Sequence, residues 1–79
     1  MTHVPHGLHE EFPQAAAAIS RLRIADAHFA RLADTYDHLN REIHRIEAEV
    51  EPASDDALEE LKKKRLKLKD EIAAMLRAA

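Results

Sequence analysis

The stretch that decides the fold is residues 29–50, which read FARLADTYDHLNREIHRIEAEV. Its apolar and aromatic residues alternate at spacings of three and four positions, and they are Phe29, Leu32, Tyr36, Leu39, Ile43, Ile46 and Val50. This spacing places all of these side chains on one face of a single long α-helix. Because water disfavours a continuous apolar face, another helix or another chain must cover it.

A second apolar stripe follows Pro52, which has no backbone N–H and disfavours helix at the residue before it. The first long helix should therefore end near residue 51. Ser54 or Asp55 can cap the next helix, and Asp56 with Glu59 is an alternative capping pair. The second stripe consists of Leu58, Leu61, Arg65, Leu68, Ile72, Met75 and Ala79, with Leu66, Ala73 and Leu76 beside it.

These two stripes predict an all-α fold, an antiparallel two-helix hairpin of coiled-coil type preceded by a short N-terminal helix. We expect the helices to cover about residues 14–24, 27–51 and 55–77. Asp26 is the candidate N-cap of the first long helix. The pattern leaves open whether the short helix packs on the hairpin.

The predicted domain organisation is simple. Residues 13–79 form one helical-hairpin domain, and residues 1–12 form a flexible arm that contains His3, His6 and His9. A neutral imidazole is a good metal ligand, but three on a flexible arm have no defined geometry, so we expect no built metal site, and metal buffering by this arm stays open as a third possible function. The Glu-x-x-His pair of di-iron bundles is also absent from the sequence.

The size and composition of the chain predict self-association. A domain of 79 residues buries only about 60% of its unfolded surface, and this chain has no cysteine for a disulfide or a thiolate metal site. Two facing stripes form only a thin layer. We therefore expect hairpins to assemble as a homodimer or higher oligomer in a helical bundle, with oligomer number and hairpin register left open.

The charges are unevenly distributed along the chain. Residues 26–52 carry seven acids and three bases, a sum of −4, whereas residues 53–79 carry six acids and seven bases, a sum of +1. Lys62, Lys63, Lys64, Arg65, Lys67 and Lys69 form a basic block. Such a block can bind a polyanion, but Leu66 and Leu68 interrupt it and no aromatic residue is present for base stacking. We expect most of this block to be solvated or paired within the chain.

Arg65 is unusual because a charged residue falls inside an apolar stripe. Its stem can pack while its head reaches water, or it can be partly buried and paired across the hairpin, or it can contact a ligand. The candidate partners for the second arrangement are Asp37, Asn40 and Glu42. Acidic residues of the first long helix also face basic residues of the second, where Glu47 can approach Lys62 or Glu42 can approach Lys64.

Several runs of the sequence resemble a known family. They are LEELKKKRLKLKDEI at 58–72, FARL at 29–32, YDHLNREI at 36–43, RIE at 45–47 and the Phe12-Pro13 pair. Together they resemble the YdcH-like family of small bacterial proteins of unknown function, over about residues 12–76. The resemblance implies a helical hairpin that self-associates. It carries no known activity, so no functional residue is transferred from it.

The sequence favours a non-enzymatic protein. It has no glycine-rich phosphate loop and no cysteine nucleophile, and Ser20 and Ser54 have no convincing His and acid partners. We therefore expect no catalytic residue and no cofactor. The N-terminus lacks a basic segment followed by an apolar one, and no apolar run approaches the ~18 residues that span a bilayer. We expect a cytoplasmic protein without a membrane partner.

We therefore expect a structural or protein-interaction module whose partner is a second copy or another protein. The predicted interface residues are Phe29, Leu32, Tyr36, Leu39, Ile43, Ile46, Val50, Leu58, Leu61, Leu66, Leu68, Ile72, Met75 and Leu76. The alternative function is a small nucleic-acid-binding regulator. Its predicted polyanion-binding face consists of Lys62, Lys63, Lys64, Arg65, Lys67 and Lys69.

Overall fold

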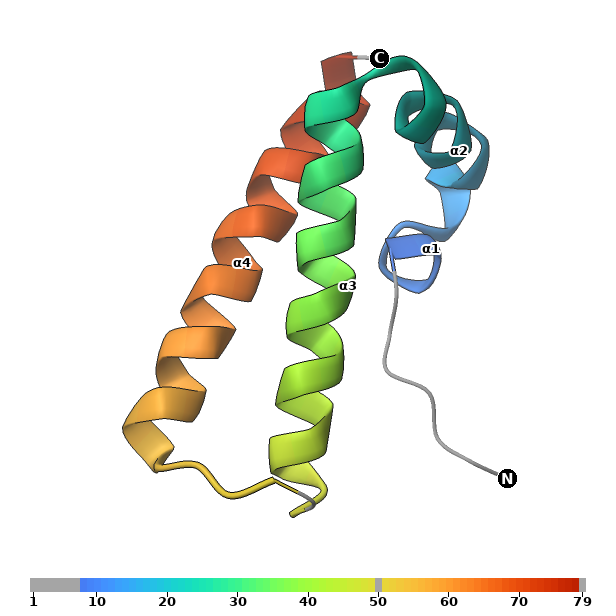
Figure 1. The fold of residues 1–79 in the computed structure, drawn as a ribbon. Helices are drawn as coiled ribbons and strands as arrows, with labels where there is room; N and C mark the ends of the chain where they lie inside the picture. Colours follow the sequence, from blue (N-terminus) through green and yellow to red (C-terminus); the bar gives the residue numbers. More distant parts are fainter. Residues whose placement is uncertain (1–7, 50, 79) are drawn as a thin grey trace, which may run out of the picture.

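The computed structural model describes residues 8–49 and 51–78, and within them it contains helices and no strand. The elements are α1 (Leu8–Glu11), the 3-10 helix η1 (Pro13–Ala15), α2 (Ala16–Ala25), α3 (Ala27–Glu47) and α4 (Asp55–Ala78). Helices α3 and α4 form the antiparallel hairpin (Figure 1). The prediction of an all-α hairpin with a short N-terminal helix is confirmed.

Among the residues that the structure describes, the N-terminal elements cover only one end of the hairpin. In Figure 1, α3 lies in the middle with α4 along one side, while α1 and α2 lie on its other side, beside its N-terminal part. We call residues 27–37 of α3 with 67–78 of α4 the covered half. Residues 38–47 of α3 with 55–66 of α4 are the uncovered half, which ends in the turn between the two helices.

The main core lies in the covered half. Its fully buried side chains come from every layer, and they are Leu8, Ile19, Phe29, Ala33, Tyr36 and Ile72. Partly buried residues pack around them, namely Phe12, Ala15, Leu22, Leu32, Leu68, Met75 and Leu76. Elements α1, η1 and α2 thus pack on the hairpin and supply a third layer at this end, which we call the N-terminal layer.

Asp26 separates α2 from α3, as predicted. Its backbone is extended, with φ −132° and ψ 108°, which interrupts the helical path. Its Oδ1 accepts hydrogen bonds from the backbone N–H groups of His28 at 2.9 Å and Phe29 at 3.1 Å. These are two of the N–H groups that have no partner inside a helix, so the cap stabilises the start of α3.

Helix α3 ends at Glu47, four residues before the predicted end at residue 51. The chain leaves the helix through Glu49, whose φ of 62° lies in the left-handed region. The N–H groups of Ala48 and Glu49 still donate to His44 and Ile46, which closes the last turn. The prediction failed because a left-handed residue ended the helix before Pro52 could. Val50 lies outside the described residues.

Helix α4 begins where the sequence indicated. The Ser54 hydroxyl accepts a hydrogen bond from the N–H of Ala57 at 3.1 Å, and the Ser54 carbonyl accepts one from Leu58 at 3.0 Å. Ser54 is therefore the cap, rather than Asp56 with Glu59. The helix runs to Ala78, one residue past the predicted end.

The structure differs from the expected flexible arm at residues 8–12. Leu8 is only 1% exposed and belongs to the main core, and its carbonyl accepts a hydrogen bond from the N–H of Phe12 at 2.9 Å. The physical reason is that the covered half needs a third apolar layer, which the Leu8 and Phe12 side chains help to supply. His3 and His6 lie outside the described residues, as does the side chain of His9.

Candidate functional site

Most of the predicted interface residues are already covered within one chain. Phe29, Tyr36, Leu39, Ile43 and Ile72 are at most 7% exposed. In this conformation they cannot contact a second molecule, so their role is to hold the hairpin together. Leu32, Leu68, Met75 and Leu76 are half-buried against the main core. Leu76, which lies beside the second stripe, is therefore packed within a single chain as well.

The uncovered half retains an apolar surface. Ile46, Leu58 and Leu61 are only half-buried there, and Leu66 is 60% exposed. Within residues 8–49 and 51–78, the other large exposed hydrophobic residue is Ile24, at 90%, near the end of α2. Ile24 lies outside both heptad stripes and is not among the predicted interface residues, although that position could have indicated its exposure. Val50 again lies outside the described residues.

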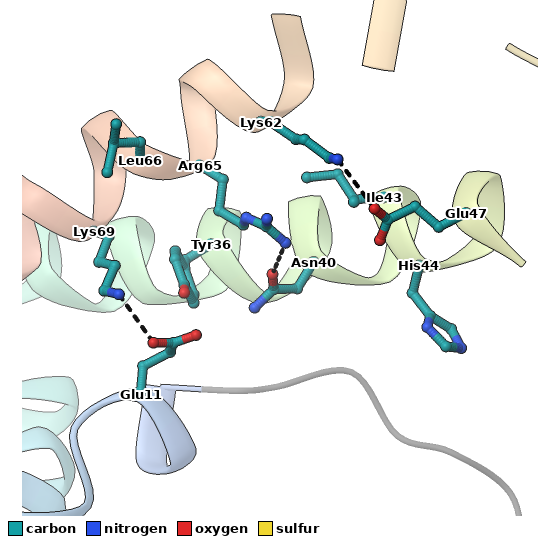
Figure 2. Close-up of a pocket in the computed structure, with 10 residues that line it drawn as sticks. All are labelled: Glu11, Tyr36, Asn40, Ile43, His44, Glu47, Lys62, Arg65, Leu66 and Lys69. Carbon is teal, nitrogen blue, oxygen red and sulfur yellow. Dashed lines mark hydrogen bonds and ion pairs between the residues drawn. The ribbon is translucent and has the colours of Figure 1, made fainter. Parts of the chain in front are cut away.

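A groove of about 410 Å³ lies between α3 and α4 and extends to α1. Figure 2 shows the side chains around it, which mix three cations with polar and apolar groups. They are Glu11, Tyr36, Asn40, Ile43, His44, Glu47, Lys62, Arg65, Leu66 and Lys69. Its size falls in the range of small-ligand sites, roughly 300–1,000 Å³.

Arg65 occupies the centre of this groove. Its Nη1 donates a hydrogen bond to Oδ1 of Asn40 at 3.0 Å, and Asn40 is only 5% exposed (Figure 2). Of the arrangements considered for Arg65, the structure thus shows a half-buried residue paired across the hairpin, with Asn40 as the partner. Because this partner is a neutral amide, the pair does not neutralise the guanidinium charge.

Ion pairs flank Arg65 on both sides. Lys62 Nζ lies 3.1 Å from Glu47 Oε2, which is one of the two cross-hairpin pairs that the sequence indicated. Lys69 Nζ lies 3.0 Å from Glu11 Oε2 and so joins α4 to α1. The sequence offered no signal for the second pair, because its two residues are 58 positions apart and meet only through the packing of α1.

The electrostatics of the groove act on Tyr36. Burial raises the pKa of the Tyr36 hydroxyl above its ordinary value of 10.0, and the nearby Glu11 carboxylate raises that pKa further. A hydrogen bond with Asn40 and the positive charges of Lys69 and Arg65 act in the opposite direction on the same pKa. The Glu11 carboxylate also raises the pKa of Lys69 above 10.5, through a hydrogen bond and through its charge.

The basic block does not form one continuous face. Lys62, Arg65 and Lys69 line the groove, as Figure 2 shows, whereas Lys63, Lys64 and Lys67 are exposed elsewhere on α4. Lys63 Nζ lies 3.9 Å from Glu60 Oε1 on the same helix. Because α4 divides the block between two directions, it offers no single track for a nucleic-acid backbone.

A second polar cluster joins α2 to α3. Arg23 donates to Asp34 at 3.1 Å and to Asp37 at 3.0 Å, while Asp37 Oδ1 is buried without a hydrogen-bond partner. This cluster could not be predicted from the sequence, since no local pattern links residue 23 to residues 34 and 37. It fastens the N-terminal layer to the hairpin.

The described residues show neither a metal cluster nor a membrane span. Within residues 8–49 and 51–78, no three His, Asp or Glu side chains are grouped so that they could hold a metal ion. None of the helices described there combines the length and the apolar character that crossing a membrane requires.

Comparison with known proteins places the chain in a family. A family model described as "protein of unknown function (DUF465)" matches residues 29–76, which include nearly all of α3 and α4. The chain belongs to the DUF465 family. This is the YdcH-like family, so the predicted resemblance is confirmed, although the match begins at residue 29 rather than residue 12. No curated protein and no solved structure matches the chain.

Proposed function

We propose that the protein is a non-enzymatic interaction module that associates with a second copy of itself through the uncovered half of its hairpin. The observation that carries this proposal is the incomplete cover of the hairpin. The N-terminal layer protects one end, while Leu66 stays 60% exposed and Ile46, Leu58 and Leu61 are only half-buried at the other. A second copy can cover these side chains and so stabilise both chains.

Charge complementarity supports a second copy as the partner. Residues 47–60, around the turn, carry seven acids and no base, whereas residues 62–69 carry six bases and no acid. If two hairpins lie antiparallel with their turns overlapping, the acidic segment of each copy faces the basic segment of the other. A two-fold axis makes both contacts equivalent. Opposite charges favour this arrangement over a parallel one, which juxtaposes like charges.

The test is the solution mass of the chain, measured by sedimentation over a dilution series, with circular dichroism on the same samples. We expect a dimer or larger assembly that dissociates on dilution. The Leu66→Asp variant should lower the mass because it places a charge in the interface. Ile24→Asp is the matched control, since Ile24 is also exposed but lies outside the uncovered half, and its mass should be unchanged.

Two outcomes contradict the proposal. One is a wild-type chain that stays monomeric and fully helical at every concentration. The other is an equal loss of mass in Leu66→Asp and Ile24→Asp. A further check uses salt, because association through facing charged segments should weaken as the ionic strength rises.

Nucleic-acid binding is less well supported as a function. Three members of the basic block line the groove, and two of these are paired with Glu47 and Glu11. Gel-shift titration of an oligonucleotide tests it directly. Binding that weakens steeply with salt and is lost in the Lys64→Glu, Lys67→Glu double variant would favour the nucleic-acid function over self-association.

A further inference from the structure

The groove around Arg65 combines features of an anion site. Arg65 is held at the helix interface by a buried neutral residue, Asn40, through one of its two Nη atoms. A guanidinium has five N–H donors in a planar fork, so this single contact leaves donors available. The Asn40 contact fixes the orientation of the fork, which reduces the ordering that a ligand would otherwise require.

The net charge of the groove indicates which ligand charge it favours. Three cations line it, Lys62, Arg65 and Lys69, together with the two carboxylates Glu11 and Glu47. Three positive charges less two negative charges leave +1. Each carboxylate forms an ion pair with a lysine, so the positive charge that remains without a paired carboxylate belongs to Arg65. This balance matches one negative charge and disfavours a polyanion.

The groove also has an apolar wall. Leu66 follows Arg65 in the chain, is 60% exposed, and lines the groove (Figure 2), whereas the nearby ring of Tyr36 is only 1% exposed. An anion with a short aliphatic part can therefore place its charged group on Arg65 and its carbon chain along Leu66. Planar carboxylates match a guanidinium in a bidentate manner, with two parallel hydrogen bonds.

We propose that this groove is a binding site for a monoanionic aliphatic carboxylate, with Arg65 as the residue that recognises it. The carboxylate has two possible sources, a free organic acid or an acidic side chain of a second copy. Both share the same contact with the Arg65 guanidinium. The site does not depend on self-association, because all of the groups that form it belong to one chain.

Tyr36 provides a direct readout of the groove. It is the only tyrosine, and the chain has no tryptophan, so tyrosine fluorescence reports on this site alone. The full chain is titrated at neutral pH with sodium butyrate, and sodium chloride at the same ionic strength is the control. We expect a saturable change with butyrate in the millimolar range and no saturable change with chloride.

Substitutions at Arg65 test the assignment. Arg65→Met keeps the length of the stem and removes the charge, and we expect it to weaken butyrate binding by about tenfold or more, as loss of a charged hydrogen bond implies. Lys67→Met is the matched control, because it removes an exposed cation from the same helix and should leave binding unchanged. Circular dichroism verifies that both variants keep their helices. Equal weakening by both variants would overturn the proposal.

A pair of ligands tests the apolar wall. Butyrate should bind roughly fourfold more tightly than acetate, since its additional methylene groups are partly removed from water along Leu66. In Leu66→Ala the two ligands should bind with similar affinity. Butyrate and acetate binding equally to the wild-type chain would contradict the role assigned to Leu66.

The source of the carboxylate is distinguished by mass. If an acidic side chain of a second copy fills the groove, Arg65→Met lowers the solution mass and added butyrate competes with assembly. If the ligand is a free acid, Arg65→Met leaves the mass unchanged, although added butyrate can still compete with assembly because Leu66 belongs to both the groove and the proposed interface. A monomeric wild-type chain that still binds butyrate through Arg65 would reject the proposed self-association and leave this site intact. Failure of butyrate to saturate would reject the site alone.

Discussion

The two halves of the hairpin use the same heptad pattern but reach different degrees of burial. In the covered half, Phe29, Tyr36 and Ile72 are at most 1% exposed, because α1 and α2 add a third layer. In the uncovered half, Leu39 and Ile43 are also at most 7% exposed, but Ile46 and Leu61 remain half-buried and Leu66 is 60% exposed. A stripe thus specifies which face of a helix is buried, whereas the third layer accounts for the cover of residues beside the stripe, where Leu76 of the covered half is half-buried and Leu66 of the uncovered half is 60% exposed.

The largest expected effect is a difference in the free energy of unfolding when one isoleucine in each half is substituted. Ile72→Ala removes a fully buried side chain from the main core and should lower the free energy of unfolding by about 2–5 kcal/mol. Ile46→Ala, the matched change in the uncovered half, should cost about half as much or less in dilute samples of the monomer, since the side chain is only half-buried in a single chain. Urea unfolding followed by circular dichroism measures both.

If Ile72→Ala is unfolded without urea, Ile72→Val provides a milder test. It should remain folded and lose about 0.5–1.5 kcal/mol. Equal losses in Ile72→Ala and Ile46→Ala would mean that the N-terminal layer does not deepen the core of the covered half.

The second prediction concerns the layer itself. Leu8→Ala should destabilise the protein by about 2–3 kcal/mol, near the lower end for a buried leucine, because a short terminal helix can rearrange around the cavity. Leu66→Ala is the control, and its effect in the monomer should stay within about 0.5 kcal/mol because its side chain is largely exposed. Thermal unfolding of dilute samples compares the two. A Leu8→Ala variant as stable as the wild type would place the N-terminal layer outside the fold.

The α3 and α4 stripes could be predicted from sequence because each depends on local spacing, and so could the caps at Asp26 and Ser54. The end of α3 could not, since the left-handed conformation of Glu49 has no local signal such as a glycine. The burial of Leu8 was also missed. An isolated apolar residue near a terminus gains its partners only through tertiary packing.

The candidate site was also predicted only in part, because local spacing indicates some of its residues and tertiary packing brings in the others. Arg65 stood out because a charge interrupted an apolar stripe, and its pairing across the hairpin to Asn40 was among the arrangements considered. The groove itself could not be predicted, because α1 closes one side of it through the Glu11–Lys69 pair. Long-range pairs of this kind are fixed by how layers pack, and a heptad pattern contains no information about them.

The helix caps test the same difference between the two halves, with smaller expected losses of stability. Asp26→Ala should cost about 1 kcal/mol or slightly more, because the carboxylate accepts two backbone hydrogen bonds at the start of α3. Ser54→Ala should cost less, since Ser54 satisfies one N–H with its side chain at the exposed turn. Chemical denaturation measures both, and Asp26→Asn, which keeps the capping oxygen, is the control. A larger loss in Ser54→Ala than in Asp26→Ala would contradict the greater importance of the covered half.

The smallest effect is a loss of stability in alkaline solution, located where α1 meets the hairpin. Folding raises the pKa of Tyr36 above 10.0, mainly through burial, and that of Lys69 above 10.5, mainly through Glu11. Since the folded state holds these protons more tightly, the contribution of the two groups to stability is complete below pH 10. It is lost as the pH rises through the pKa values of the folded state.

Urea unfolding over roughly pH 9 to pH 12 measures this decline in stability. Glu11→Gln should flatten it, because Glu11 raises both pKa values, whereas Glu71→Gln, an exposed control on α4, should not. A decline that is equally steep in all three proteins would show that the contact between α1 and α4 is absent in solution.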